Sequence, residues 1–342
     1  MKVAVTGATG NVGTALLRRL SVEPDIEVVG FARRTPGPGA GPPYDRVEWH
    51  SIDVGAADAV ERLTERFRGA DAVVHLAWQN VPTYHRPHQR ATNLRGSRQV
   101  CDATVQAGVG SLIYASASAA YSPGPKNRYV DESWPVLGVP VADFSIDKAT
   151  VEALLDDLER REPQLRVVRL RQALVFQREA GIEFTKHFLG RFGRFMVRRG
   201  SPLIPLHRRL RVQVVHAEDV ADAYLRVLRG DVRGAFNIAA DPPLDGQALA
   251  EETYGVKLPM SLGMVRTLTA ASWRLGLQPT PPTWVDIAAA IPLMDCSRAE
   301  HELGWRPNYD GRHALRDLLD GVAAGAGAPT PALRPALTPS YG

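Results

Sequence analysis

Cysteine is scarce in this chain, and long apolar runs are missing. The 342 residues include two cysteines, Cys101 and Cys296, and no CxxC pair. Two cysteines cannot build a disulfide framework, so we expect a reduced, cytoplasmic protein. No apolar run reaches the roughly 18 residues that a membrane-spanning helix needs, and a glycine-rich stretch follows the first residues too early for a signal peptide. We therefore expect neither secretion nor a membrane partner.

A strong excess of one charge is also lacking. The chain has 41 basic and 37 acidic residues, and a net charge of +4 is too small to indicate a nucleic-acid partner. The nine histidines form no HxH, HExxH or comparable spacing, and no GxSxG occurs. We therefore expect no metal site and no hydrolase of the GxSxG class. Hydrophobic residues make up 44% and charged residues 23%, which fits an ordinary globular core.

Short apolar runs alternate with segments of helical periodicity through the first 170 residues. This alternation predicts βαβ units around a parallel sheet, and right-handed crossovers favour a doubly wound arrangement. We therefore predict an α/β protein with a Rossmann-type domain over residues 1–170, to which segments around 212–240 return. The expected strands are Lys2–Thr6, Ile26–Phe31, Arg46–Trp49, Asp71–Ala77, Ser111–Ala115 and Leu165–Leu170, and the expected helices are Val12–Leu20, Ala56–Phe67, Thr92–Ala107 and Val141–Arg160.

The order of the segments changes after residue 170. Residues 171–322 predict a smaller, mixed but mostly helical region that would bind the substrate, and several prolines interrupt it near its end. The expected elements before residue 240 are the helices Phe184–Val197 and Ala217–Leu228 and the strands Val212–Val215 and Ala235–Ile238. Residues 323–342 are rich in proline, alanine and glycine, and we expect a loose tail there.

A glycine-rich turn follows the first expected strand and opens the first helix. It reads Thr6-Gly7-Ala8-Thr9-Gly10-Asn11-Val12-Gly13, a GxxGxxG spacing. Gly7 and Gly10 would let the backbone approach a pyrophosphate, and Gly13 would let the helix pack closely on the strand. Thr9, Asn11 and Val12 would lie beside the phosphates at the positive helix N-terminus. The alternative is a glycine-rich turn that binds nothing.

The end of the second strand predicts which nicotinamide cofactor binds. NAD-binding proteins place an acidic residue there to hold the ribose hydroxyls. This chain instead has Arg33 and Arg34, and two guanidinium groups suit a 2′-phosphate. We therefore expect NADP rather than NAD. The alternative is a pair of solvated arginines in a basic loop.

Further short motifs continue along the chain: Asp53-Val54, His75-Leu76-Ala77-Trp78, Asn93-Leu94-Arg95-Gly96, Val215-His216-Ala217-Glu218-Asp219 and Glu302-Leu303-Gly304-Trp305. With the glycine turn, they make the chain resemble the extended short-chain dehydrogenase/reductase family, which includes NAD-dependent epimerases and dehydratases. The resemblance covers about residues 1–320. It implies that Asp53 and Val54 contact adenine, that Leu76 and Ala77 lie beside the adenosine ribose, and that Asn93 braces the sheet at the cofactor. It also implies a homodimer through the fourth and fifth helices.

The family transfers protons with a Ser/Thr, a Tyr and a Lys. The resemblance places the lysine at Lys148, within Asp143-Phe144-Ser145-Ile146-Asp147-Lys148. The tyrosine position is then Phe144, which has no proton to give. Counting back from the Tyr121 landmark puts the serine position at Ala117. Two of the three catalytic positions therefore depart from the family pattern, an atypical active site that leaves the ordinary redox step in doubt.

Neighbouring polar residues are candidates to replace the missing acid. Ser118, Tyr121 and Asp147 are the main candidates, and Asp143 and Tyr129 also lie near in the sequence. Each has a plainer interpretation: Asp147 suits a solvated helix carboxylate, and Tyr121 suits packing as well as it suits substrate contact.

Residues 184–217 are strongly basic and contain no Asp or Glu. This charge suits an anionic small-molecule substrate, because sugar-nucleotide members of the family hold the substrate diphosphate in this region. The interleaved Phe188, Phe192 and Phe195 equally suit an ordinary amphipathic helix with a basic solvent face. The two interpretations stay open at this point.

Three functions follow from these residues. The first is an NADP-dependent oxidoreductase or epimerase-like enzyme with a replaced acid. The second is a non-redox enzyme, an isomerase, cyclase or lyase, on the same scaffold. The third is a catalytically inactive protein that senses NADP. We rank the first highest, because Lys148 and the glycine turn are present.

Overall fold

The computed structural model describes residues 1–79, 89–190, 195, 197–198 and 203–334. Its centre is a seven-stranded sheet in which every neighbouring pair is parallel. This confirms the predicted α/β, Rossmann-type fold. In spatial order the strands are β3 (Glu48–Ser51), β2 (Glu27–Ala32), β1 (Lys2–Thr6), β4 (Ala72–His75), β5 (Ser111–Ala117), β7 (Arg166–Gln172) and β11 (Gly234–Ile238).

The strand register brings the expected site segments to one edge of the sheet. Thr6 lies opposite His75, and His75 lies opposite Tyr114. The residues after β1, β4 and β5 therefore meet at the carboxyl ends of the strands, where open α/β sheets bind ligands.

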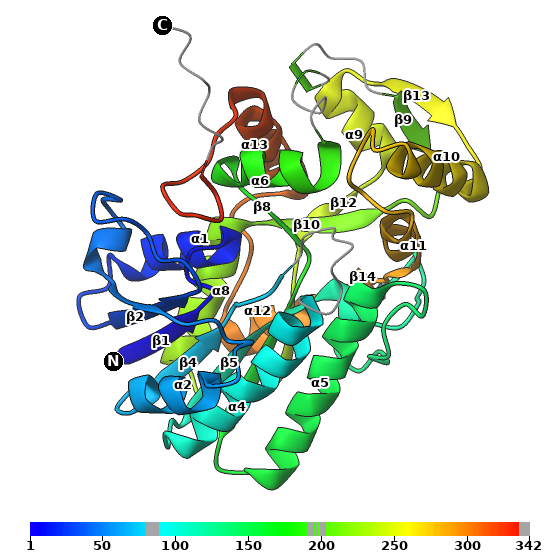
Figure 1. The fold of residues 1–342 in the computed structure, drawn as a ribbon. Helices are drawn as coiled ribbons and strands as arrows, with labels where there is room; N and C mark the ends of the chain where they lie inside the picture. The colour runs from blue at the N-terminus through cyan, green and yellow to red at the C-terminus, as the bar shows by residue number, and fades with distance from the viewer. Residues whose placement is uncertain (80–88, 191–194, 196, 199–202, 335–342) are drawn as a thin grey trace, which may run out of the picture.

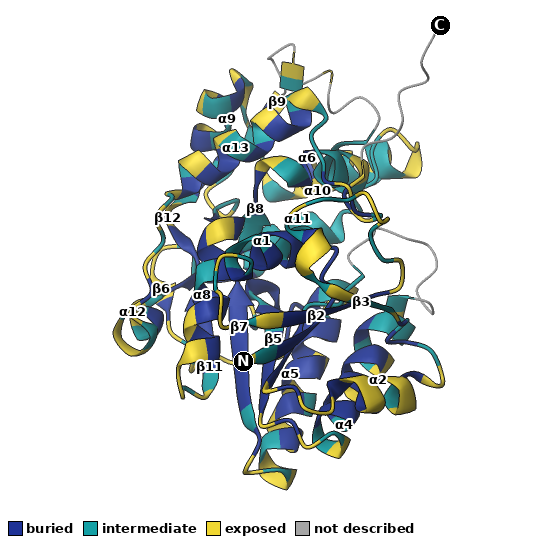
Figure 2. Ribbon diagram, turned by 90° about the vertical axis from the view of Figure 1, so that its left-hand side faces the viewer, coloured by how far each residue is buried: buried dark blue, intermediate teal, exposed yellow. Residues whose placement is uncertain are grey.

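Helices cover both faces of the sheet because its strands are apolar on both sides (Figure 1). On one face α2 (Ala59–Phe67), α4 (Gly96–Gln106) and α5 (Asp143–Arg161) pack on the strands. On the other face lie α1 (Asn11–Leu20), α8 (Ala217–Arg229) and α12 (Ser297–Leu303). Figure 2 shows the strands between these layers as largely buried.

The C-terminal half contains more strands than the sequence predicts. Of the segments expected to return to the main sheet, Gly234–Ile238 does so, whereas Val212–His216 pairs with two other strands. Short pairs of strands such as β9 and β13 have little local signal, because their partners lie far apart in the chain. The strands outside the main sheet are β10 (Val212–His216), which the sequence predicts, and six that it does not: β6 (Tyr129–Val130), β8 (Leu174–Phe176), β9 (Leu203–Leu206), β12 (Ala240–Leu244), β13 (Val256–Pro259) and β14 (Leu293–Met294).

The helices of this half are short and packed around these strands. The helix predicted over 184–197 is interrupted, because a helical run from Gly181 to Leu189 ends at Gly190 with φ +70°. Its residues 191–194 and 196 lie outside the described residues. The remaining helices are α6 (Gly181–Phe184), α9 (Gly246–Thr253), α10 (Leu262–Arg274), α11 (Thr283–Ala290) and α13 (Gly311–Ala324).

The expectation of a loose tail from residue 323 is wrong for its first part. Helix α13 continues to Ala324, and Thr330 and Leu333 beyond it are fully buried. Leu333 joins the core cluster on the α1 face, and this apolar burial orders a segment whose composition suggests a linker. Residues 335–342 lie outside the described residues. No helix within the described ranges is long and apolar enough to span a membrane.

Candidate active site

The glycine turn lies between β1 and α1 at the carboxyl edge of the sheet. Gly7 has φ +72°, and a Cβ there would lie 2.6 Å from the backbone nitrogen of Ala77. A Cβ on Gly13 would lie 2.6 Å from the Ala8 carbonyl oxygen. A Cβ on Gly10 would meet a single described atom within 4 Å, the Gly7 oxygen at 3.4 Å. Gly7 and Gly13 are therefore needed for packing, whereas Gly10 leaves space on the turn.

The start of α1 can receive an anion. Gly10 is its N-cap, and no side chain of the described residues caps the helix there. The first amides of the helix therefore remain as donors at its positive end. The Asn11 side chain points elsewhere: its Nδ2 donates to the Val175 carbonyl at 2.9 Å, and Gln177 donates to its Oδ1 at 2.6 Å. Asn11 thus ties the turn to β8, while Val12 supplies a backbone amide.

The two arginines expected to select the cofactor lie at the exposed end of β2. Arg33 and Arg34 directly follow Ala32, and both side chains are exposed. The Asp53 side chain, just after β3, accepts a hydrogen bond from the Gly55 amide at 2.9 Å. This bond stabilises the turn that these residues form. The Val54 carbonyl accepts a hydrogen bond from Gln99 at 2.7 Å, which anchors this turn to α4.

The segment after β4 lies against the glycine turn. The Leu76 amide donates to the Thr6 carbonyl at 3.0 Å, which places Leu76 and Ala77 beside Gly7. Asn93 is buried, and it accepts the Gln79 amide at 2.8 Å and donates to the Gln79 carbonyl at 3.1 Å. Asn93 therefore holds the shape of this segment through its side-chain amide.

Lys148 is buried where α5 meets β5. Its Nζ donates to the Ala115 carbonyl at 2.7 Å and to the Tyr114 hydroxyl at 3.2 Å. The ammonium also lies 3.7 Å from the centre of the Trp78 ring. Burial lowers the pKa of Lys148 to about 7, although the charge of Glu152 acts in the opposite direction. A lysine with this pKa can give and take protons near neutral pH.

The positions expected for the serine and the tyrosine, Ala117 and Phe144, lie together in one apolar cluster. Ala117 and Phe144 both pack against the buried residues of this cluster, and so does Trp284 from α11. The Phe144 ring centre lies 5.2 Å from that of Trp284 and 6.0 Å from that of Trp78. Hydrocarbon and aromatic surface therefore surrounds both expected positions.

The structure does not support Tyr121 as the substitute acid. Tyr121 is fully buried, its hydroxyl donates to Asn237 Oδ1 at 2.7 Å, and Arg171 donates to that hydroxyl at 3.0 Å. Burial raises its pKa to about 12. Asp147 is buried too, with Arg90 Nε 3.3 Å from its carboxylate, and so is not the solvated carboxylate of the plainer interpretation.

The other candidate acids are more exposed or isolated. Tyr129 donates to Asp241 at 3.0 Å from the short strand β6, and Asp143 is exposed at the first turn of α5. Ser118 is 8% exposed and begins a short 3₁₀ turn directly after Ala117. Ser118 is thus the immediate neighbour of Ala117, as Asp143 is of Phe144.

A buried ion pair beneath the site was not predicted as functional. Arg171 donates to both oxygens of Glu152 at 3.0 Å, and the Ser116 hydroxyl donates to the same carboxylate at 2.5 Å. Burial would raise the pKa of Glu152, but the bonds and charge of Arg171 hold it below its usual range. The spacing of Glu152 after Lys148 and the Arg169-Leu170-Arg171 motif were the available sequence signals.

Phe188 of the basic segment faces inward, whereas Phe195 is 57% exposed. The Phe188 ring stacks on Phe184 at 4.9 Å and meets Trp284 edge-on at 5.1 Å. The Arg211 guanidinium donates a hydrogen bond to the Lys126 carbonyl at 3.1 Å and so already has a partner within the protein. Phe192, Arg191, Arg194 and Arg199 lie outside the described residues. The described part of this segment therefore presents an apolar face to the site, and in the same part of the chain no group of three His, Cys, Asp or Glu residues suits a metal.

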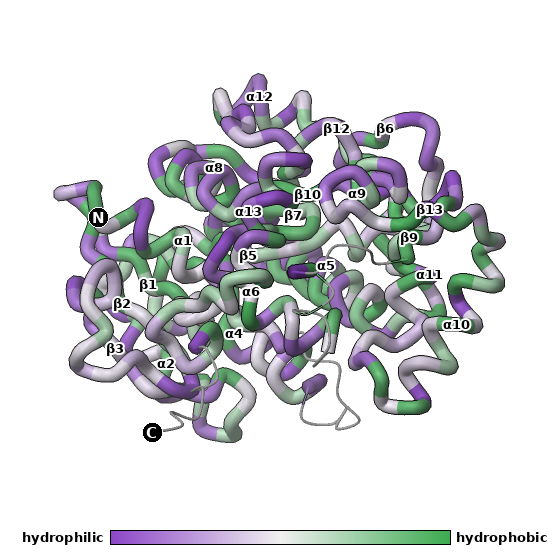
Figure 3. Tube along the Cα trace, turned by 90° about the horizontal axis from the view of Figure 1, so that it is seen from above, coloured by the Kyte–Doolittle hydropathy of each residue, from purple (hydrophilic) through white to green (hydrophobic). Residues whose placement is uncertain are grey.

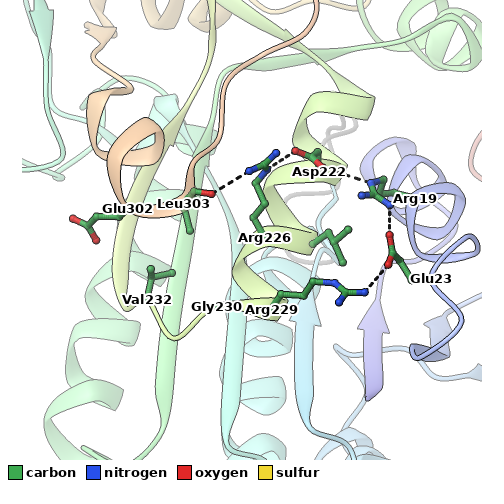
Figure 4. Close-up of a pocket in the computed structure, with 10 residues that line it drawn as sticks. Arg19, Glu23, Asp222, Arg226, Arg229, Gly230, Val232, Glu302 and Leu303 are labelled. Carbon is green, nitrogen blue, oxygen red and sulfur yellow. Dashed lines mark hydrogen bonds and ion pairs between the residues drawn. The ribbon is translucent and has the colours of Figure 1, made fainter.

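A surface cavity of about 400 Å³ lies at the far ends of α1 and α8 (Figure 4). Its charged groups already pair with one another: Glu23 accepts from Arg19 and Arg229 at 2.5 Å each, and Asp222 accepts from Arg226 at 2.6 Å. Arg19 lies at the end of α1 opposite the glycine turn. This cavity is therefore separate from the candidate site.

Comparisons with known proteins agree with this arrangement. The UDP-glucose 4-epimerase of Thermotoga maritima superposes with a TM-score of 0.70 at 19% identity, covering 94% of this chain and 98% of that one. The Thermus thermophilus UDP-glucose 4-epimerase in complex with NAD gives 0.70 at 21% identity, covering 94% and 99%. At these identities the likeness shows the fold.

Sequence relatives include an uncharacterized protein of Mycobacterium tuberculosis, 25% identical over 325 residues. The match covers 94% of this chain, but the chain spans only 30% of that relative's length. The sterol-4-alpha-carboxylate 3-dehydrogenase of Saccharomyces cerevisiae is 26% identical over 185 residues, 51% of each chain. The model of the NAD dependent epimerase/dehydratase family matches residues 3–239. The predicted resemblance is thereby confirmed: the chain belongs to the NAD-dependent epimerase/dehydratase family.

Proposed function

We propose that this protein is an NADP(H)-dependent oxidoreductase in which Lys148 transfers the proton that a tyrosine transfers elsewhere in the family. The observation that carries the proposal is the buried Lys148 ammonium, whose pKa lies near 7, next to a site without hydroxyls at positions 117 and 144. Two relatives named as dehydrogenases support a redox reaction: the yeast sterol enzyme, and the L-arabinose 1-dehydrogenase of Haloferax volcanii, which is 31% identical over 117 residues.

The residues at the carboxyl edge suit a nicotinamide dinucleotide. The open face of Gly10 and the uncapped start of α1 would hold its pyrophosphate. Arg33 and Arg34 would bind a 2′-phosphate, which favours NADP over NAD. The indole Nε1 of Trp78 is buried without a hydrogen-bond partner among the described residues, and it supplies one more donor beside Lys148. When bound, the cofactor gives or accepts a hydride.

Lys148 completes the reaction on the protein side. Phe144 and Lys148 are one helical turn apart on α5, so a substrate oxygen held at Phe144 would lie on the same helix face as the lysine. In the reductive direction, the Lys148 ammonium would give a proton to the substrate oxygen, and solvent would protonate the resulting neutral amine again.

The test measures NADPH oxidation with a panel of aldehydes and ketones. Because the ammonium is the acid, the rate of reduction should be highest below pH 7 and fall about tenfold per pH unit above it. Lys148→Met should lower the rate by about 10²–10⁴-fold. Lys126→Met is the matched control, because burial also lowers the pKa of Lys126 to about 7 but that lysine bonds to Arg211 outside the site.

The apolar surroundings of Phe144 favour a second candidate, a protein that binds NADP without redox turnover. It would be either a non-redox isomerase, cyclase or lyase, or an NADP sensor. Calorimetry separates these from the main proposal: NADPH that binds tightly but is not consumed with any carbonyl compound would overturn the oxidoreductase. A rate that is independent of pH between 6 and 9 would overturn the role of Lys148.

A further inference from the structure

An apolar cavity lies next to the candidate active site. Its volume is about 360 Å³, and it is enclosed by β8, β9, β10, α6, α9 and α13. Its walls include Phe176, Phe184, Val214 and Leu318. Figure 3 shows that this part of the chain, around β9, has hydrophobic segments of its own, apart from the central sheet. An unfilled apolar cavity is unfavourable, and water gains little by entering it, so an apolar ligand would be stabilised there.

Among the described residues, the polar side chains on the wall are already hydrogen-bonded. The Asp245 carboxylate caps α9 by accepting the Ala248 amide at 2.9 Å. The Thr253 hydroxyl donates to the Leu249 carbonyl at 2.7 Å within the same helix. Neither group is free to select a diphosphate or a sugar, and both lie on one helix. The chemistry of the wall therefore selects hydrocarbon.

The cavity shares part of its wall with the cluster that contains Ala117 and Phe144. Val212 lines the cavity and also packs in the cluster with Ala117 and Phe144. Ala288 of α11 lines the cavity one turn from Trp284, which stacks on Phe144. The cavity and the Phe144 cluster therefore adjoin through Val212 and α11.

A row of aromatic rings follows the same course. Successive ring centres from Trp78 through Phe144, Trp284, Phe188 and Phe184 are 4.9–6.0 Å apart. The row starts at the Lys148 ammonium and ends at Phe184 in the cavity wall. Aromatic surface over this whole course gives a flat hydrocarbon body continuous contact.

We propose that the cavity binds the hydrocarbon body of the substrate, and that the substrate is an apolar ketone or the corresponding secondary alcohol. This proposal rests on the proposed oxidoreductase function for the reacting carbon, but the cavity's preference for hydrocarbon does not depend on turnover. It differs from the anionic substrate that the basic segment suggests, because Phe184 and Phe188 of that segment pack toward Trp284 and the site.

The experiment uses methyl ketones of increasing length, from 2-hexanone to 2-tetradecanone, with UDP-glucose as the polar comparison. Calorimetry in the presence of NADP⁺ measures binding, and NADPH oxidation measures turnover separately. Each buried methylene should tighten binding about fourfold until the cavity is full. Leu319→Trp, which fills the cavity from α13, should abolish this dependence on length. Leu268→Trp is the matched control on the exposed surface of α10, where the side chain is 57% exposed, and should preserve it.

The outcomes separate the two proposals. Ketones that bind with the length dependence but leave NADPH unconsumed would support the cavity and refute the redox function. Turnover without length dependence would support the redox function and overturn the cavity as the substrate site, as would tighter binding of UDP-glucose than of every ketone. Near-ultraviolet circular dichroism checks that Leu319→Trp is folded. If Leu319→Trp does not fold, Ala288→Phe narrows the same cavity from α11 and should likewise abolish the dependence of binding on ketone length.

Discussion

The cofactor edge and the substrate side of this protein are built in different ways. At the cofactor edge nearly every polar side chain has a defined partner: Asn11 bonds to β8, Asn93 to Gln79, and Asp53 to its own turn. On the substrate side aromatic and aliphatic side chains surround Ala117 and Phe144 and continue into an apolar cavity. The edge beside the glycine turn is therefore polar and hydrogen-bonded, whereas the region around Phe144 presents mainly hydrocarbon surface.

The largest expected effect tests whether the cofactor edge binds a pyrophosphate. Gly10→Val should abolish NADPH binding, at least a hundredfold loss of affinity, because the side chain would occupy the open face of the turn. The protein should remain folded, since a Cβ at position 10 fits at 3.4 Å from its neighbour. Calorimetry measures the affinity. Gly37→Val is the control, because no described atom lies within 4 Å of a Cβ there, and NADPH affinity that survives Gly10→Val would place the pyrophosphate elsewhere.

The second effect concerns the stability of the two halves. Glu152→Gln leaves the buried Arg171 without its charge partner and should lower the free energy of unfolding by about 3–5 kcal/mol. Glu251→Gln removes an exposed carboxylate that pairs with Arg312 across α9 and α13, and should change stability far less. Urea unfolding measures both variants. If both variants lost the same free energy of unfolding, the buried ion pair of the sheet would contribute no more stability than the exposed pair between α9 and α13.

The pH dependence of Glu152→Gln follows from the lowered pKa of Glu152. A carboxyl group whose pKa is lower in the folded state contributes its stability above the unfolded value, about 4.3, and loses it as the pH falls toward the folded value. The stability difference between the native protein and Glu152→Gln should therefore be largest near neutral pH and shrink below about pH 4. A difference that grows in acid would contradict the ion pair as its source.

Sequence periodicity predicts the cofactor half well and the substrate half poorly. Lys2–Thr6 and Gly7 form a local strand and turn, so their neighbours in the chain determine their structure. The strands β9 and β13 pair across about fifty residues, and the cavity arises from segments brought together only by folding. Trp284 could not be predicted for the same reason, because its contact with Phe144 forms only on folding and no neighbouring residue in the sequence indicates it.

The third effect concerns cofactor selection at the edge of the sheet. Replacing both Arg33 and Arg34 with Ala should weaken NADPH binding far more than NADH binding, because each charge-assisted bond to a phosphate contributes about 1.5–3 kcal/mol. Arg160→Ala with Arg161→Ala is the matched control at the exposed end of α5. Calorimetry with each cofactor gives the ratio of affinities. A native protein that binds NADH as tightly as NADPH would exclude a phosphate-binding role for these arginines.

The smallest effect tests a contact that joins the two halves. Thr330 is fully buried in the C-terminal segment, and its hydroxyl donates to the Thr9 carbonyl of the glycine turn at 2.9 Å. Thr330→Val has nearly the same shape but loses this bond and the one that the hydroxyl accepts from the Leu333 amide at 3.3 Å, and should lower the free energy of unfolding by about 1–2 kcal/mol. Because the Thr9 carbonyl then loses its partner, the turn should move more freely and bind NADPH a few times more weakly. Thr330→Ser keeps the hydroxyl and should restore NADPH affinity even if stability stays lower, which separates the hydrogen bond from packing. If Thr330→Val bound NADPH as tightly as the native protein, the C-terminal segment would stabilise the fold without positioning the cofactor turn.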